Sequence, residues 1–183
     1  LRCFDNGNIV HVHGNVDPVR DKEIIDFELQ LKDLESIDAS IQKIQRAAKA
    51  GDKDSVKKFE VYEKIKKHLE QGKSVRSLEL DESELEIVYP LFLLTIKPVL
   101  YVCNVDEGSV VNGNKYVDQV RNATAQEKAE ILIISAGIEA DIAEMESYDE
   151  RMIFLNDMGL QEAGVTKLIK AAYKLLGLST YFT

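Results

Sequence analysis

The sequence lacks an apolar run long enough to cross a membrane. Its longest, residues 90–104, is interrupted by a lysine and a proline, whereas a span needs about 20 apolar residues. The chain has no signal-like segment, and it holds only two cysteines, Cys3 and Cys103, both in apolar, strand-like surroundings. Such thiols are typical of small buried side chains in a reducing compartment, not of a disulfide framework. We therefore expect a cytoplasmic protein with no membrane partner.

Motifs of several enzyme classes are also missing. The chain contains no G-x-x-x-x-G-K-[ST] sequence, so a loop that cradles nucleotide phosphates has to lie outside these 183 residues. Neither cysteine has the partners of a nucleophile, and no Ser-His-Asp order is persuasive, so we predict no catalytic residue here. His11 and His13 would share one face of an extended segment, but no third ligand is suitably spaced, and we predict no metal site. We expect His68, which lies among lysines, to be solvated.

The composition is that of a folded chain with an uneven charge distribution. Hydrophobic residues make up 45% and charged residues 30% of the 183 residues, as in ordinary globular proteins. The formal net charge is −9, but residues 43–76 hold 11 Lys and Arg against 5 Asp and Glu. This segment therefore carries a net charge of +6 on a body of −15. Its placement is the first indication of function.

The basic segment coincides with a predicted pair of helices. Asp17 followed by Pro18 is typical of a helix start, and apolar residues then recur every three or four positions to Ala48. A turn at Gly51 and a second helix over residues 55–71 predict an antiparallel hairpin. Its lysines either form a solvated charged face or a basic arm that contacts phosphate backbones. The candidate contacts are Lys57, Lys58, Lys66 and Lys67.

The remainder of the chain has the pattern of an α/β protein. Two continuous apolar runs, residues 98–103 and 131–134, are typical of strands buried on both faces of a parallel sheet. Helices are predicted around and between them, and their order indicates a right-handed α/β unit. We predict helices over residues 81–89, 112–128 and 165–176, a turn at residues 156–159, and a last strand beginning at residue 179.

Polar turns follow both predicted strands. Asn104 and Glu107 come directly after the first, and Ser135 and Ala136 after the second. Ligands of parallel sheets bind beyond the carboxyl ends of the strands, where an amide, a carboxylate and backbone N–H groups could pair with a planar heterocycle. The alternative is structural: Asn104 starts a turn and Glu107 caps a helix.

Together these segments resemble the YchF/Obg-like ATPases, a family of P-loop NTPases related to translation factors. The resemblance covers essentially the whole chain. Asn104 and Glu107 begin and end one of its most specific stretches, and Ser135 and Ala136 form another. The matching segments are residues 2–5, 8–12, 14–21, 97–107, 135–136 and 175–183.

The resemblance implies a fold and a division of the chain. The expected class is α/β, a partial Ras-like G domain with a doubly wound parallel sheet and an inserted antiparallel helical coiled-coil arm. It divides the chain into a G-domain segment with the start of a long helix, the arm, the C-terminal half of the G domain, and the start of a TGS domain. The corresponding residues are 1–35, 36–80, 81–178 and 179–183.

The resemblance also implies a function for the whole protein. Related GTPases recognise guanine with Asn-Lys-x-Asp, whereas here Val105 replaces the Lys and Glu107 the Asp. This exchange should weaken guanine selectivity, and the resemblance implies that the whole protein binds and hydrolyses ATP, with GTP as an alternative. The expected base-binding residues are Asn104, Val105, Glu107, Ser135 and Ala136.

Other parts of that function fall outside the chain. Mg²⁺ would accompany the nucleotide on segments that these residues lack, so we expect the chain alone to bind no cofactor and to be inactive. The expected partner is the ribosome or its RNA, contacted through the basic hairpin. The alternative is a non-catalytic RNA- or ribosome-binding helical module.

Overall fold

The computed structural model describes residues 1–7, 14–127, 129–179 and 181. It divides into two units, one made of Leu1–Lys22 with Val99–Thr183 and the other of Glu23–Pro98. His11 and His13 lie outside the described residues, as does most of the strand predicted from residue 179. No helix in the described part of the chain is long and apolar enough to span a membrane.

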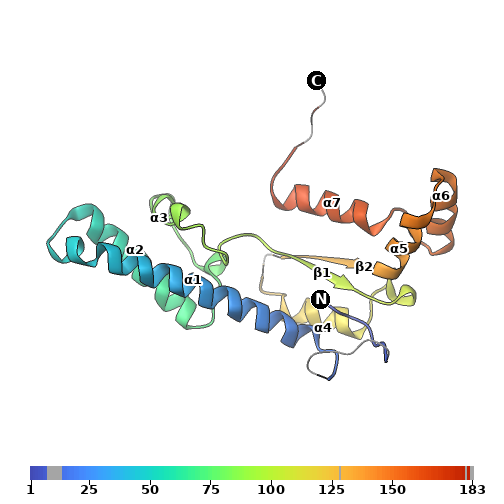
Figure 1. The fold of residues 1–183 in the computed structure, drawn as a ribbon, viewed down its shortest axis with the longest axis horizontal. Helices are drawn as coiled ribbons and strands as arrows, with labels where there is room; N and C mark the ends of the chain where they lie inside the picture. The colour runs from blue at the N-terminus through green and yellow to red at the C-terminus, as the bar shows by residue number, and fades with distance from the viewer. Residues whose placement is uncertain (8–13, 128, 180, 182–183) are drawn as a thin grey trace. The chain divides into compact units, whose positions relative to one another are not determined.

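The predicted helical hairpin is confirmed. Helix α1 (Pro18–Lys49) begins where the sequence indicates, because the Asp17 carboxylate accepts a hydrogen bond from the Arg20 N–H at 3.0 Å. Helix α2 (Lys53–Glu70) begins slightly earlier than residue 55, because Asp52 caps it by accepting from the Ser55 N–H at 2.9 Å. The two helices pack antiparallel through buried apolar side chains (Figure 1). These are Ile37, Ile41, Val61, Tyr62, Ile65 and Leu69.

A buried polar group ties the chain after the hairpin to helix α1. Here lie the short helices η1 (Val75–Ser77), α3 (Glu82–Val88) and η2 (Tyr89–Leu91). The buried carboxylate of Asp33 accepts hydrogen bonds from the backbone N–H groups of Leu94 and Thr95, both at 2.7 Å. The Thr95 hydroxyl in turn accepts from the Val75 N–H at 3.0 Å. This network was not predicted from the sequence.

The other unit contains a small parallel sheet. Strands β1 (Leu100–Asn104) and β2 (Glu130–Ile134) pair in parallel, with Cys103 opposite Ile133. The N-terminal segment forms a single parallel bridge to β1 between Arg2 and Asn104, and the Cys3 N–H donates to the Asn104 carbonyl at 2.7 Å. The described part of the unit thus has helices around two paired strands, so the predicted α/β character holds in this coarser form.

Some helices differ from the prediction. Helix α4 (Lys115–Ala123) is shorter than residues 112–128, because Asn114 caps its start and the buried Thr124 hydroxyl returns to the Val120 carbonyl at its end. Helix α7 (Gly164–Leu175) agrees with the sequence pattern. The helices η3 (Glu107–Ser109), α5 (Ala136–Glu144) and α6 (Tyr148–Asp157) were not predicted. The capping box formed by Ser147 and Glu150 at the start of α6 is a sequence signal from which this helix could have been predicted.

Candidate functional site

Two polar turns meet at the carboxyl edge of the parallel strands. Asn104 is the last residue of β1, and Ser135 directly follows β2. The side-chain oxygen of Asn104 accepts a hydrogen bond from the backbone N–H of Ala136 at 2.9 Å. Because parallel strands end at the same edge, residues 32 positions apart come together here. The bond fixes the orientation of the Asn104 amide, so its nitrogen is the remaining donor.

The third residue of this edge is Glu107, the first residue of η3. A Cβ built on Gly137 would lie 3.4 Å from Glu107 Oε1, so the carboxylate reaches the first turn of helix α5. Glu107 and Ala136 are both exposed, whereas Asn104 is half-buried. The arrangement thus offers an amide donor and a carboxylate acceptor side by side at the surface.

Val105 and Ser135 contribute differently. Each is only 3% exposed. The Val105 side chain belongs to the hydrophobic core of the unit, and its N–H donates to the Ile134 carbonyl at 2.9 Å. Both residues therefore lie beneath the surface and hold the turns in place. The atoms accessible to a ligand belong to Asn104, Ala136 and Glu107.

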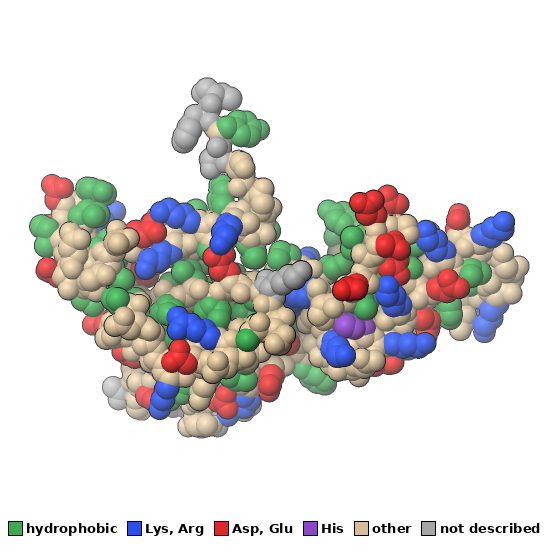
Figure 2. All heavy atoms as spheres, turned by 180° about the vertical axis from the view of Figure 1, so that it is seen from behind, with side chains coloured by type: hydrophobic (Ala, Val, Ile, Leu, Met, Phe, Trp, Pro, Cys, Tyr) green, Lys and Arg blue, Asp and Glu red, His purple; other side chains and the backbone are tan. Residues whose placement is uncertain are grey.

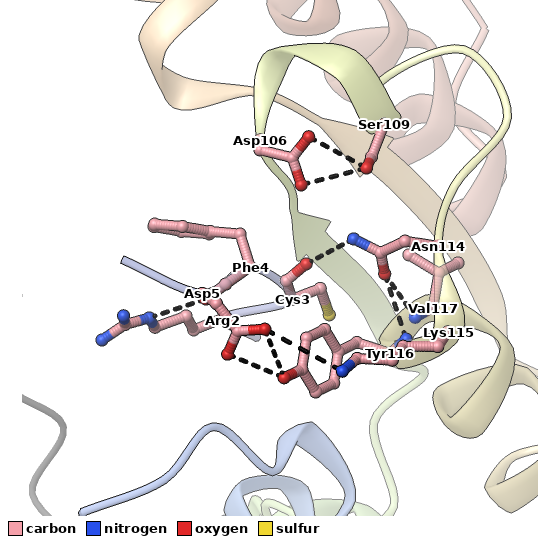
Figure 3. A network of polar contacts seen from close by, with 10 residues as sticks. All are labelled: Arg2, Cys3, Phe4, Asp5, Asp106, Ser109, Asn114, Lys115, Tyr116 and Val117. Carbon is pink, nitrogen blue, oxygen red and sulfur yellow. Dashed lines mark hydrogen bonds and ion pairs between the residues drawn. The ribbon is translucent and has the colours of Figure 1, made fainter. Parts of the chain in front are cut away.

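A polar network holds the N-terminal segment against β1 and α4 (Figure 3). Asn114 donates from its side-chain nitrogen to the Cys3 carbonyl at 2.7 Å, while its oxygen caps α4. The Tyr116 hydroxyl donates to the Asp5 carboxylate at 2.8 Å, and this bond raises the pKa of the phenol. At the top of the same view, the Ser109 hydroxyl donates to the Asp106 carboxylate at 3.0 Å. This network, which the sequence analysis missed, stabilises the strand order beside the candidate site.

The cysteines are free and buried, as expected from the sequence. A thiol hydrogen bond to Cys103, together with burial, raises the pKa of Cys3. A protonated, inaccessible thiol is a poor nucleophile. Among the described residues no group of three His, Cys, Asp or Glu side chains could hold a metal ion.

The predicted basic contacts of the hairpin are not equivalent. Lys57, Lys58 and Lys67 are exposed. Lys66 is half-buried and donates to the Asp38 carboxylate at 2.6 Å, which raises the pKa of the lysine. Lys66 therefore joins the two helices and its charge is already neutralised, which leaves three of the four lysines available to a partner.

His68 differs from the expectation of a solvated side chain. Its Nε2 lies 2.9 Å from the Ser77 hydroxyl and 3.2 Å from the Ser74 carbonyl. Partial burial lowers its pKa, and the nearby Lys73 acts in the same direction. The histidine therefore links helix α2 to the chain that follows it.

The fold and the polar edge define an α/β protein that carries a helical hairpin and a candidate ligand site at the ends of its parallel strands. No family model matches the chain. It is 45% identical over 185 residues to the Bacillus subtilis protein named ribosome-binding ATPase YchF, and 43% identical over 183 residues to the Escherichia coli O157:H7 protein of the same name. Both alignments cover 100% of this chain and 50% of the relative.

A solved structure agrees with these matches. The Schizosaccharomyces pombe YchF GTPase superposes with a TM-score of 0.83 at 27% identity, over 96% of this chain and 48% of that one. The chain is thus similar over its whole length to proteins of the YchF family, and it spans about half the length of the curated relatives it matches.

Proposed function

We propose that the chain forms the base-recognition side of an ATP site in a ribosome-associated ATPase. The observation that supports this most directly is the hydrogen bond between Asn104 and Ala136, which fixes a side-chain amide at the carboxyl edge of the strands. The relatives' names, ribosome-binding ATPase, support the activity and the partner. The chain would then be a partial Ras-like G domain with a doubly wound sheet completed by residues outside it, and the helical hairpin would be its inserted arm.

The polar edge suits a purine base. With its oxygen engaged by Ala136, Asn104 presents its nitrogen as a donor, and both adenine and guanine carry an acceptor at N7. Selectivity then depends on Glu107. A carboxylate accepts from the exocyclic amine of adenine, whereas the longer Glu side chain does not reproduce the bidentate contact that an Asp makes with guanine. We propose ATP as the nucleotide, with GTP as the alternative.

The phosphates and Mg²⁺ would be held by parts of the whole protein that this chain lacks. The chain has no phosphate-binding motif, so its own role is to position the base. The division into residues 1–35, 36–80, 81–178 and 179–183 is part of this proposal. The 183-residue chain alone should show no ATP turnover above the rate of the buffer, and turnover that survives repurification would contradict the assignment.

Two variants of Asn104 test the base site in the whole protein. Asn104→Asp keeps an oxygen for the Ala136 N–H but removes the amide donor, whereas Asn104→Ala removes both. Asn104→Asp should melt at the wild-type temperature and bind a fluorescent ATP analogue about tenfold more weakly, a loss of about 1.4 kcal/mol. Asn122→Ala, an exposed amide on α4, is the control and should bind normally. Unchanged affinity in Asn104→Asp would exclude Asn104 from base recognition.

We also propose that the hairpin contacts ribosomal RNA through Lys57, Lys58 and Lys67. Reversing these three charges should weaken ribosome binding. The slope of the logarithm of the binding constant against the logarithm of the salt concentration should become less steep by about three. The matched control reverses three exposed lysines outside the hairpin: Lys115, Lys170 and Lys174. Equal loss in both triple variants would indicate a general charge effect and contradict the proposal.

The second candidate function is a helical RNA- or ribosome-binding module without nucleotide chemistry. It is favoured by the exposed lysines of the hairpin, which do not depend on Asn104 for their placement. Ribosome binding that is lost in the lysine variant, with no nucleotide binding by the whole protein, would select this alternative.

A further inference from the structure

Helix α3 packs with one side against helix α2. Lys64 donates to both oxygens of Glu84 at 2.8 Å, and Val88 is 1% exposed. Asp81 caps the helix, and its pKa is lowered by hydrogen bonds from the Glu84 and Ser83 residues. The acidic groups on this side are therefore neutralised or used within the unit.

The opposite side of α3 and the following turn carry an exposed apolar stripe. Leu85, Tyr89 and Phe92 are 43%, 80% and 73% exposed, and their spacing of four and three residues matches one helical face. Glu82 and Glu86 lie beside them and are also exposed. Among the described residues, neither carboxylate has a hydrogen-bond or ion-pair partner. We call these five residues the α3 face.

The segment that contains the α3 face carries charge of one sign, and the nearest lysines, Lys57 and Lys64 of helix α2, act on Asp81 and Glu84. Residues 78–96 hold five Asp and Glu and no Lys, Arg or His, although the preceding residues 43–76 are strongly basic. Figure 2 shows the acidic side chains gathered over α3, with hydrophobic side chains next to them. The unit thus presents a negatively charged apolar surface that is distinct in composition from the basic hairpin.

The backbone at Phe92 holds an aromatic ring in solvent. Its φ of 51° and ψ of 37° are left-handed, and it is the single non-glycine residue in the described part of the chain with positive φ. This conformation is unfavourable for residues that carry a Cβ. Phe92 is 73% exposed, so its ring gains little free energy from burial within the unit. The Phe92 N–H bond to the Tyr89 carbonyl at 3.2 Å and the anchoring of Leu94 by Asp33 keep it there.

We propose that the α3 face docks a Lys- and Arg-rich protein segment that also carries apolar side chains. Exposed aromatic residues are the preferred anchors of protein interfaces, and a rim of carboxylates attracts a basic partner. The same carboxylates repel the phosphates of RNA, so nucleic acid does not fit this surface. The proposal goes beyond the nucleotide site and the hairpin, because it involves neither Asn104 nor the hairpin lysines.

Selection from a displayed library of random peptides tests the proposal on the 183-residue chain. Peptides that bind the wild type but not Phe92→Gly are collected, and their affinities are measured by fluorescence anisotropy. We expect them to combine Lys or Arg with Leu or aromatic residues. The Phe92→Gly variant should bind such a peptide at least about tenfold more weakly. Glu82→Gln with Glu86→Gln should weaken binding and flatten its salt dependence.

Matched variants separate binding from folding. Glycine tolerates a positive φ, so Phe92→Gly should melt at or above the wild-type temperature although it loses the peptide. Phe27→Ala removes an aromatic ring of similar exposure, 58%, from helix α1 and should bind the peptide normally. The proposal is overturned if no peptide depends on Phe92, or if the selected peptides are acidic. It is also overturned if a single-stranded RNA oligonucleotide binds and loses affinity in Phe92→Gly, because the partner would then be nucleic acid.

Discussion

Asp33 and Thr95 lie 62 residues apart in the sequence and are joined by a hydrogen bond of 2.7 Å from the Thr95 N–H to the Asp33 carboxylate. Both residues are buried, with 1% and 0% of their surface exposed. The contact connects the middle of helix α1 to the chain that leaves the unit. The hairpin unit is thus stabilised by this buried polar contact, the Asp33 anchor, as well as by the apolar side chains packed between its two helices.

Replacing Asp33 by Ala should strongly destabilise the hairpin unit. The change leaves the N–H groups of Leu94 and Thr95 without acceptors in a buried site, which costs about 2–5 kcal/mol in the free energy of unfolding. Urea unfolding followed by circular dichroism measures the loss. Glu35→Ala removes an exposed carboxylate from the same helix and should change stability by less than about 0.5 kcal/mol. Similar losses in both variants would show that the anchor is unimportant.

Two glycines at the starts of helices should respond oppositely to alanine. A Cβ on Gly164 would lie 2.8 Å from Glu139 Oε1 and 2.9 Å from Ile134 Cγ2, and Glu139 is held there because it accepts from the Gly164 N–H at 2.6 Å. Gly164→Ala should therefore lower stability by about 1–3 kcal/mol. A Cβ on Gly137 meets nothing closer than 3.4 Å, so Gly137→Ala should be neutral or stabilising by about 0.5 kcal/mol. Thermal unfolding of both variants in the absence of nucleotide measures these changes in stability. A stabilised Gly164→Ala would disprove the close contact.

The cysteines should be protected from modification in the folded chain. Cys3 and Cys103 are both 0% exposed, so a reagent cannot reach either sulfur, although a hydrogen bond from Cys3 lowers the pKa of Cys103. Reaction with a thiol reagent at mildly alkaline pH should be slow in buffer and fast in urea, with two thiols modified per chain. Fast modification of either cysteine in buffer would mean that the β1 edge opens readily.

Local patterns were sufficient to predict much of the fold. Asp17 and Pro18 define the start of α1, and the apolar runs identify both strands, because these signals depend on a few neighbouring residues. Asp33 could not be predicted, since a carboxylate on a mostly polar helix shows its importance only through residues 61 and 62 positions away. Helix α5 was missed because its nine residues bury only Ile138 and Ile142.

The candidate site was predictable in part for a similar reason. The proximity of Asn104 and Ala136 follows from the rule that parallel strands end at one edge. Val105 was expected to line the pocket because it occupies the position of a lysine in related GTPases. Its burial follows the alternation of β1, in which Tyr101 and Cys103 also point into the core. Whether Val105 contacts a base stays a prediction.

The protonation of His68 should make the hairpin unit less stable in mild acid. Burial lowers the pKa of this imidazole below its usual value of about 6.5, so the unfolded chain binds the proton more tightly than the folded chain. The free energy of unfolding contributed by His68 is therefore complete above about pH 6.5 and is lost as the pH falls through the lowered pKa. His68→Gln retains a hydrogen-bonding side chain for Ser77 but cannot titrate, so the slope of stability against pH between about 5 and 7 should decrease. Urea unfolding of both proteins across this range measures the slope, and an unchanged slope in His68→Gln would assign the acid sensitivity to other groups.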